Sequence, residues 1–133
     1  MKKVYVIDDD RDIVESISMV LKSNGYDVAA QYVDENVIEN IYGYNPDIII
    51  LDVMFPENNA AGFDIARQIK KDKKLSNIPI IMLSAVNERG IYMGHFSDQD
   101  IDSSWLPVEL FLDKPVHPKE LIEKVKSVLK DKE

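Results

Sequence analysis

Two short runs of entirely apolar residues place the strongest constraint on how this chain can fold. They cover residues 48–51 and 79–83, and each is followed at once by a polar residue. A strand that is apolar at every position, and not only at alternate positions, is typical of a parallel sheet with helices on both faces. The sequence therefore predicts an α/β fold in which these two runs are buried strands.

Segments with the spacing of one helix face lie between the apolar runs. The first carries Ile13, Ile17, Val20 and Leu21, which recur as they would on one side of a helix. Either of two acids, Asp10 or Asp12, is expected to cap the start of this helix. The pair at residues 24–25, Asn-Gly, is expected to end it, because glycine accepts the left-handed conformation of a helix end.

Three further helices and three further strands complete the alternation. We expect the second helix to be capped by Asp34, the third to follow a loop at residues 56–62, and the last to begin at Pro118. The expected buried faces of these helices are Val37, Ile38 and Ile41, then Phe63, Ala66 and Ile69, then Leu121, Val125, Val128 and Leu129. The additional strands are predicted at residues 4–7, 26–32 and 108–112, the last of them ending near Lys114 and Pro115. Strand–helix alternation of this kind predicts five parallel strands with right-handed crossovers, in a single domain of residues 1–133.

Polar side chains follow the predicted strands at the points where the strands end. The first strand is followed by Asp8 and Asp9, the third by Asp52, the fourth by Ser84 and the fifth by Lys114. Ligands of open parallel sheets bind beyond the carboxyl ends of the strands, so these side chains are expected to converge. Helix capping explains one acid, such as Asp10, but not a group of acids that come from two strands.

The expected acidic cluster needs a positive partner, because carboxylates that lie close together repel one another. Mg²⁺ is the natural candidate, since it binds one or two carboxylates together with water and phosphate oxygens. A serine hydroxyl and a lysine across the same cleft would suit the spread negative charge of a phosphoryl group. The residues alone therefore predict a magnesium site that handles phosphate.

Composition excludes several other classes of function. The formal net charge of −8 argues against a nucleic acid partner and against an anionic membrane surface, both of which need clustered lysine and arginine. The sequence contains no cysteine, so disulfides and thiolate chemistry are absent. No apolar run approaches the roughly 20 residues of a membrane span, and the N-terminus does not have the pattern of a signal peptide. The expected location is the cytoplasm.

Four segments in order resemble the receiver domains of two-component response regulators. They are residues 6–10, 51–56, 82–85 and 111–115, which read VIDDD, LDVMFP, MLSA and FLDKP. The resemblance extends over nearly the whole chain. It implies a doubly wound, flavodoxin-like sheet with strand order 2-1-3-4-5 and helices on both faces.

The resemblance also implies a role for each matching residue at the acceptor. Asp52 would take a phosphoryl group from a histidine kinase or a phosphotransfer protein. Asp8 and Asp9 would hold Mg²⁺ together with Asp52, and Met54 would add only its backbone carbonyl to the metal.

Three more residues match the family pattern across the cleft. Ser84 would turn its hydroxyl toward the new phosphoryl oxygen, and Lys114 would pair first with the acceptor and then with the phosphate. Phe111 occupies the position of the family's aromatic switch, where a tyrosine is common.

The chain departs from the family pattern in two places. Residues 57–61 lengthen the loop after Pro56, and residues 86–107 form an atypical insertion between the fourth and fifth strands. This insertion shows no clean helical period, so we expect a mostly non-helical segment in place of a regular fourth helix.

Two other functions stay open at the level of sequence. A phosphatase of the haloacid dehalogenase type would use Asp8 as its nucleophile, in place of Asp52. A receiver-like module could also bind partners without any phosphorylation. The sequence does not identify the cognate kinase, the downstream partner or the oligomeric state.

Overall fold

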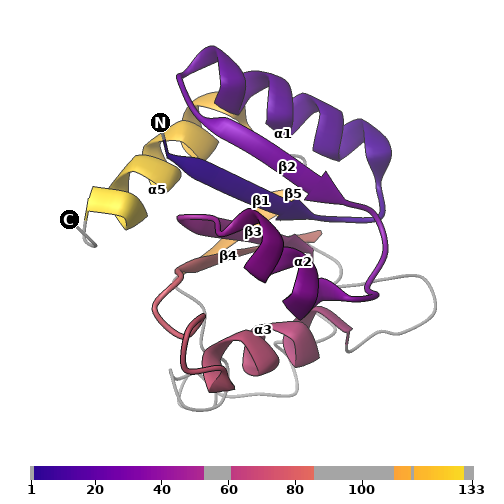
Figure 1. The fold of residues 1–133 in the computed structure, drawn as a ribbon. Helices are drawn as coiled ribbons and strands as arrows, with labels where there is room; N and C mark the ends of the chain where they lie inside the picture. Colours follow the sequence, from indigo (N-terminus) through magenta and orange to yellow (C-terminus); the bar gives the residue numbers. More distant parts are fainter. Residues whose placement is uncertain (1, 53–60, 86–109, 115, 131–133) are drawn as a thin grey trace, which may run out of the picture.

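The computed structural model describes residues 2–52, 61–85, 110–114 and 116–130 (Figure 1). Five strands form one parallel sheet in the order β2-β1-β3-β4-β5, which confirms the predicted topology. The strands are β1 Lys3–Ile7, β2 Asp27–Gln31, β3 Ile48–Asp52, β4 Ile80–Ala85 and β5 Leu110–Lys114. The helices among the described residues are α1 Arg11–Ser23, α2 Val37–Tyr44, α3 Ala61–Lys71 and α5 Pro118–Lys130. A bilayer-spanning segment is not found among these helices, which lack the necessary length and apolar character.

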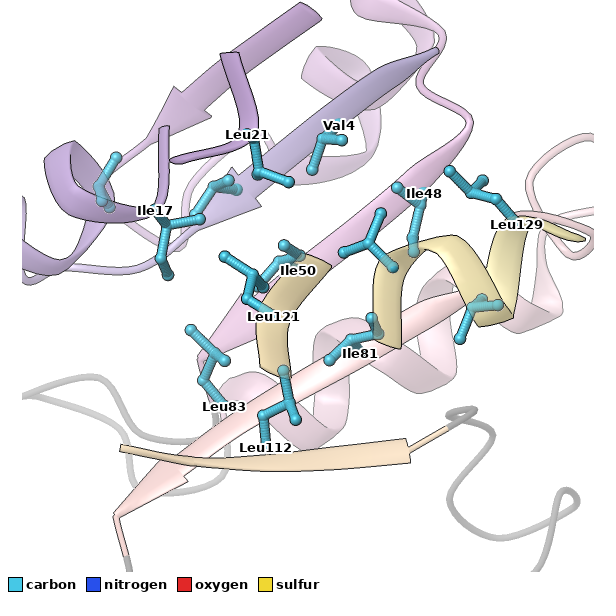
Figure 2. Packing of buried hydrophobic residues seen from close by; sticks show 14 residues of the cluster. Val4, Ile17, Leu21, Ile48, Ile50, Ile81, Leu83, Leu112, Leu121 and Leu129 are labelled. Atoms are coloured by element: carbon cyan, nitrogen blue, oxygen red, sulfur yellow. The ribbon is translucent and has the colours of Figure 1, made fainter. Parts of the chain in front are cut away.

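The sheet separates two hydrophobic clusters, because successive side chains of a strand point to opposite faces. On one face α1 and α5 pack against alternate strand residues (Figure 2), and on the other face α2 and α3 do the same. The strand residues on the α1 and α5 face are Val4, Val6, Ile48, Ile50, Ile81, Leu83 and Leu112. Those on the α2 and α3 face are Tyr5, Ile7, Ile49, Leu51, Ile80 and Met82. Each such side chain contributes about 1.5–3 kcal/mol when fully buried, so the central strands β1, β3 and β4 hold the fold together.

Helix α1 begins and ends as its sequence predicts. The Asp10 carboxylate accepts hydrogen bonds from the backbone N–H groups of Asp12 and Ile13, at 3.0 and 3.2 Å, which makes Asp10 the N-cap. Gly25, just beyond the C-terminal end, has a φ of 88°, a conformation that costs glycine little. The start of α1 is therefore fixed directly after the acidic residues that follow β1.

Helix α2 begins differently from the prediction, because Asp34 does not cap it. The helix starts at Val37, and its N-cap residue is Asn36, which has a φ of 55° and makes no capping hydrogen bond with its side chain. Asparagine enters this left-handed region more readily than most residues. The backbone itself therefore makes the turn into α2, and Asp34 stays exposed in the segment before it.

Two other boundaries also differ from the prediction, the end of β4 and the start of α3, whereas β5 ends at Lys114, near the expected position. Strand β4 continues through Ser84 to Ala85, whereas its apolar run ends earlier. It stays paired with β5 at these positions, with Ser84 opposite Asp113, because backbone pairing does not require apolar side chains. Helix α3 already starts at Ala61, within the stretch predicted as a loop. The predicted insertion at residues 86–107 lies outside the described residues.

A lysine closes the turn that leads from α3 into β4. The Lys70 Nζ donates hydrogen bonds to the backbone carbonyls of Ser76 and Ile78, at 3.2 and 2.9 Å. Both carbonyls belong to the chain that returns from the end of α3 to the start of β4. The lysine head group therefore holds the path of the chain into a central strand.

We expect Lys70→Met to lower the free energy of unfolding by about 1–2 kcal/mol, because two carbonyls lose a charged donor while the aliphatic contacts are kept. Lys71→Met, at the exposed neighbouring position, should change it by less than about 0.5 kcal/mol. Urea unfolding of the two variants measures the difference. Equal stability of both variants would contradict this role for Lys70.

Candidate functional site

Three carboxylates meet at the carboxyl edge of the sheet. Asp8 follows β1 directly, Asp52 is the last residue of β3, and Asp9 comes next after Asp8. Ile7 of β1 lies opposite Leu51 of β3, so the following residues, Asp8 and Asp52, lie at neighbouring strand ends. One oxygen from each of the three carboxylates lies within 4.8 Å of the others. The expected convergence of Asp8, Asp9 and Asp52 is thus present in the structure.

Two hydrogen bonds to backbone groups of other residues hold Asp8 in place. Its N–H donates to the carbonyl of Gln31 at the end of β2, at 3.2 Å. Its Oδ1 accepts from the N–H of Asp10 at 2.9 Å, which closes a short turn between β1 and α1. Because Asp10 also caps α1, the first acid of the cluster is tied to β2 on one side and to the helix on the other.

Burial makes this cluster electrostatically costly. Asp8 and Asp52 are 0% and 1% exposed, and Asp9 is half-buried. Like charges at such separations repel more strongly near the protein interior than in water, because the effective dielectric constant is lower. A group of oxygen-only ligands with this excess of negative charge fits a hard divalent cation such as Mg²⁺ and does not fit a softer metal that prefers nitrogen or sulfur. The three side chains therefore have the chemistry that a magnesium site requires.

The structure gives the backbone positions of two other predicted site residues, Ser84 and Lys114, and the surroundings of a third, Phe111. The backbones of Ser84 and Lys114 lie near the carboxyl ends of β4 and β5, on the same edge of the sheet as Asp52. Phe111 lies within β5, half-buried against the hydrophobic cluster of the α2 and α3 face. Met54 lies outside the described residues.

Sequence reasoning missed Gln31. This residue ends the edge strand β2 and is only 8% exposed, and its backbone carbonyl accepts the hydrogen bond from Asp8. The only signal in the sequence is a long polar side chain at the end of a weak strand, which does not distinguish it from an ordinary surface residue.

Comparison with known proteins identifies the class to which this fold and site belong. The response regulator receiver domain family matches residues 4–126, and the chain belongs to that family. The receiver domain of the Francisella response regulator 1452 is 26% identical, with all of both chains covered and a TM-score of 0.78. The N-terminal domain of the nisin resistance regulator NsrR, a lantibiotic response regulator, is also 26% identical, with 97% of this chain and 98% of that chain covered and a TM-score of 0.77.

A further solved structure shares the fold at lower identity. The chemotaxis protein CheY4 of Vibrio cholerae is 23% identical, with 96% of this chain and 98% of that chain covered and a TM-score of 0.78. Members of the receiver family are in general signalling switches and not catalytic enzymes.

Removal of one carboxylate tests the electrostatics of the cluster. In buffer with EDTA we expect Asp52→Asn to raise the free energy of unfolding by roughly 1–3 kcal/mol, because the repulsion from Asp8 and Asp9 that it removes exceeds the attraction that it loses to its other contacts. Excess MgCl₂ should stabilise the wild type more than the variant, since a ligand stabilises the state that binds it. Denaturant unfolding with and without MgCl₂ gives both quantities.

Asp47→Asn is the matched control, because Asp47 is an exposed acid that directly precedes the same strand at the opposite edge of the sheet, and asparagine keeps an oxygen that can accept the hydrogen bond from the Lys3 N–H. It should leave both the stability in EDTA and the response to MgCl₂ near those of the wild type. An Asp52→Asn variant that is less stable than the wild type in EDTA would show that repulsion does not dominate this cluster.

Proposed function

We propose that residues 1–133 act as one phosphoacceptor domain, which takes a phosphoryl group onto Asp52 from a histidine kinase or a phosphotransfer protein. The observation that carries this proposal is the meeting of the Asp8, Asp9 and Asp52 carboxylates at the carboxyl edge of the sheet. Membership of the receiver family supports the same assignment. The downstream partner would be a protein that distinguishes the two states of the domain.

The reaction at Asp52 is a transfer between two anions, and charge is its main obstacle. A carboxylate oxygen of Asp52 forms a bond to phosphorus while the bond from phosphorus to the donor breaks, and the bonding electrons leave with the donor. Mg²⁺ held by Asp8, Asp9, Asp52 and the Met54 carbonyl would supply positive charge that offsets this repulsion. Asp8 and Asp9 serve to bind that cation, and Asp52 is the group that reacts.

Ser84 and Lys114 are proposed to read the new phosphoryl group. Their backbones lie near the ends of β4 and β5, the two strands that continue the sheet beyond Asp52. A hydroxyl donor and an ammonium are suited to the added negative charge and acceptor oxygens of an acyl phosphate. Phe111, which packs against the hydrophobic cluster of the α2 and α3 face, would respond through its packing because it has no hydroxyl to donate.

Two alternatives assign the same residues differently. A phosphatase of the haloacid dehalogenase type would carry the phosphoryl group on Asp8, and a binding module independent of phosphorylation would carry it on neither acid. The receiver family match favours Asp52 over both alternatives. The location of a trapped phosphoryl group therefore decides between them.

Incubation with acetyl phosphate tests the proposal. We expect intact-protein mass spectrometry to show one added phosphoryl group in the presence of MgCl₂ and at least a tenfold weaker signal in EDTA. Fragmentation after borohydride trapping should place the modification on Asp52. Asp52→Asn should abolish the labelling, while Asp47→Asn should label as the wild type does.

Two results would contradict the assignment. Labelling of Asp8 would indicate the phosphatase chemistry. Undiminished labelling of Asp52→Asn would remove Asp52 from the reaction altogether.

A further inference from the structure

A buried side-chain amide organises the end of β2. The Oε1 of Gln31 accepts hydrogen bonds from the Tyr5 hydroxyl at 2.6 Å and from the Asn40 Nδ2 at 3.0 Å. Its Nε2 donates to the backbone carbonyls of Val33 and Glu35, at 2.6 and 3.0 Å. One amide thus joins β1, α2 and the segment between β2 and α2, with both of its donors and both acceptor positions used.

The same residue reaches the acidic cluster through its main chain. The Gln31 carbonyl accepts the N–H of Asp8, the first acid of the cluster, at 3.2 Å. The next residue along the chain, Tyr32, makes a second link, because the guanidinium of Arg11 lies 4.2 Å from the centre of its ring. Arg11 is the first residue of α1 and follows the acids directly. The turn between β1 and α1 therefore rests against the end of β2 at both of its ends.

Packing alone does not require an amide at this position. A buried polar group loses free energy unless all of its hydrogen bonds are formed, and an apolar side chain of similar size would fill the same space without that constraint. What the amide adds is direction, since four hydrogen bonds fix where the backbone of Gln31 lies. That backbone is the partner of Asp8.

We propose that Gln31 is a positioning residue for the metal site: its side-chain amide fixes the end of β2, and the β2 carbonyl in turn fixes the backbone of Asp8. This inference rests on the proposed function, because it assumes that Asp8 binds Mg²⁺. Groups that orient a metal ligand without touching the metal commonly alter metal affinity by 10–100-fold when they are replaced. Gln31 would act in this way from a strand that contributes no ligand.

The test compares Mg²⁺ affinity among variants that are all folded at the temperature of measurement. Gln31→Met removes the four side-chain hydrogen bonds and keeps a long unbranched side chain. We expect its Mg²⁺ dissociation constant to rise about tenfold. Tyr5→Phe removes one of the four hydrogen bonds, so a smaller rise, about twofold to threefold, is expected. The titration is followed through the amide NMR shifts of residues 8–12.

Ile41→Val is the matched control for loss of stability. Ile41 is fully buried on α2 in the same hydrophobic cluster as Tyr5, so its truncation weakens the fold through lost packing. It should lower the urea midpoint and leave Mg²⁺ affinity within twofold of the wild type. A loss of affinity in Ile41→Val equal to that in Gln31→Met would overturn the proposal, because general destabilisation would then explain both.

The remaining outcomes separate this inference from the proposed function. Wild-type affinity in Gln31→Met would overturn the positioning role alone. If Gln31→Met does not fold, the Mg²⁺ affinities of Tyr5→Phe and Asn40→Ala test the positioning role instead. Wild-type Mg²⁺ affinity in both of these variants would overturn that role. Absence of Mg²⁺ binding by the wild type would overturn the proposed function and this inference with it.

Discussion

The parallel pairing of β1 with β3 is the interaction on which the rest of the structure depends. Both strands are buried on both faces, and their register places Asp8 and Asp52 at adjacent strand ends. Two nearly inaccessible carboxylates repel each other and lack the stabilisation that water would give them. The apolar contacts of the sheet with α1 and α5 on one side, and α2 and α3 on the other, supply the free energy that keeps them together. A cation bound by these carboxylates would lower the electrostatic cost of holding them together.

Much of the fold could be predicted because it depends on local patterns. The all-apolar runs that became β3 and β4 indicated buried parallel strands, and the helical spacing of Leu121, Val125, Val128 and Leu129 identified the buried face of α5. The start of α2 could not be predicted, because the unusual conformation of Asn36 replaced the side-chain cap expected from Asp34. The end of β4 was also placed too early, since backbone pairing continues where the hydrophobic pattern stops.

The site divides in a similar way between what sequence predicts and what it does not. The convergence of Asp8, Asp9 and Asp52 was predicted, because strand ends of a parallel sheet share one edge and the acids follow the strands directly. Gln31 was not predicted, because the hydrogen bonds of its side chain go to Tyr5 of β1 and Asn40 of α2. These partners come together only when the chain has folded, so no local sequence pattern indicates them. The proposed metal ligands are therefore easier to recognise in this sequence than a residue such as Gln31, which contacts one of them through its backbone.

Anomalous diffraction from crystals of this protein grown with MnCl₂ and beryllium fluoride is the most direct test of the central claim, that Asp8, Asp9 and Asp52 bind one divalent cation beside the phosphoacceptor Asp52. Mn²⁺ prefers the same oxygen ligands as Mg²⁺ and gives an anomalous signal. The proposed mechanism predicts one manganese peak bound by the carboxylates of Asp8, Asp9 and Asp52, with beryllium fluoride attached to Asp52. A manganese peak away from these three acids, or beryllium fluoride attached to Asp8, would contradict it.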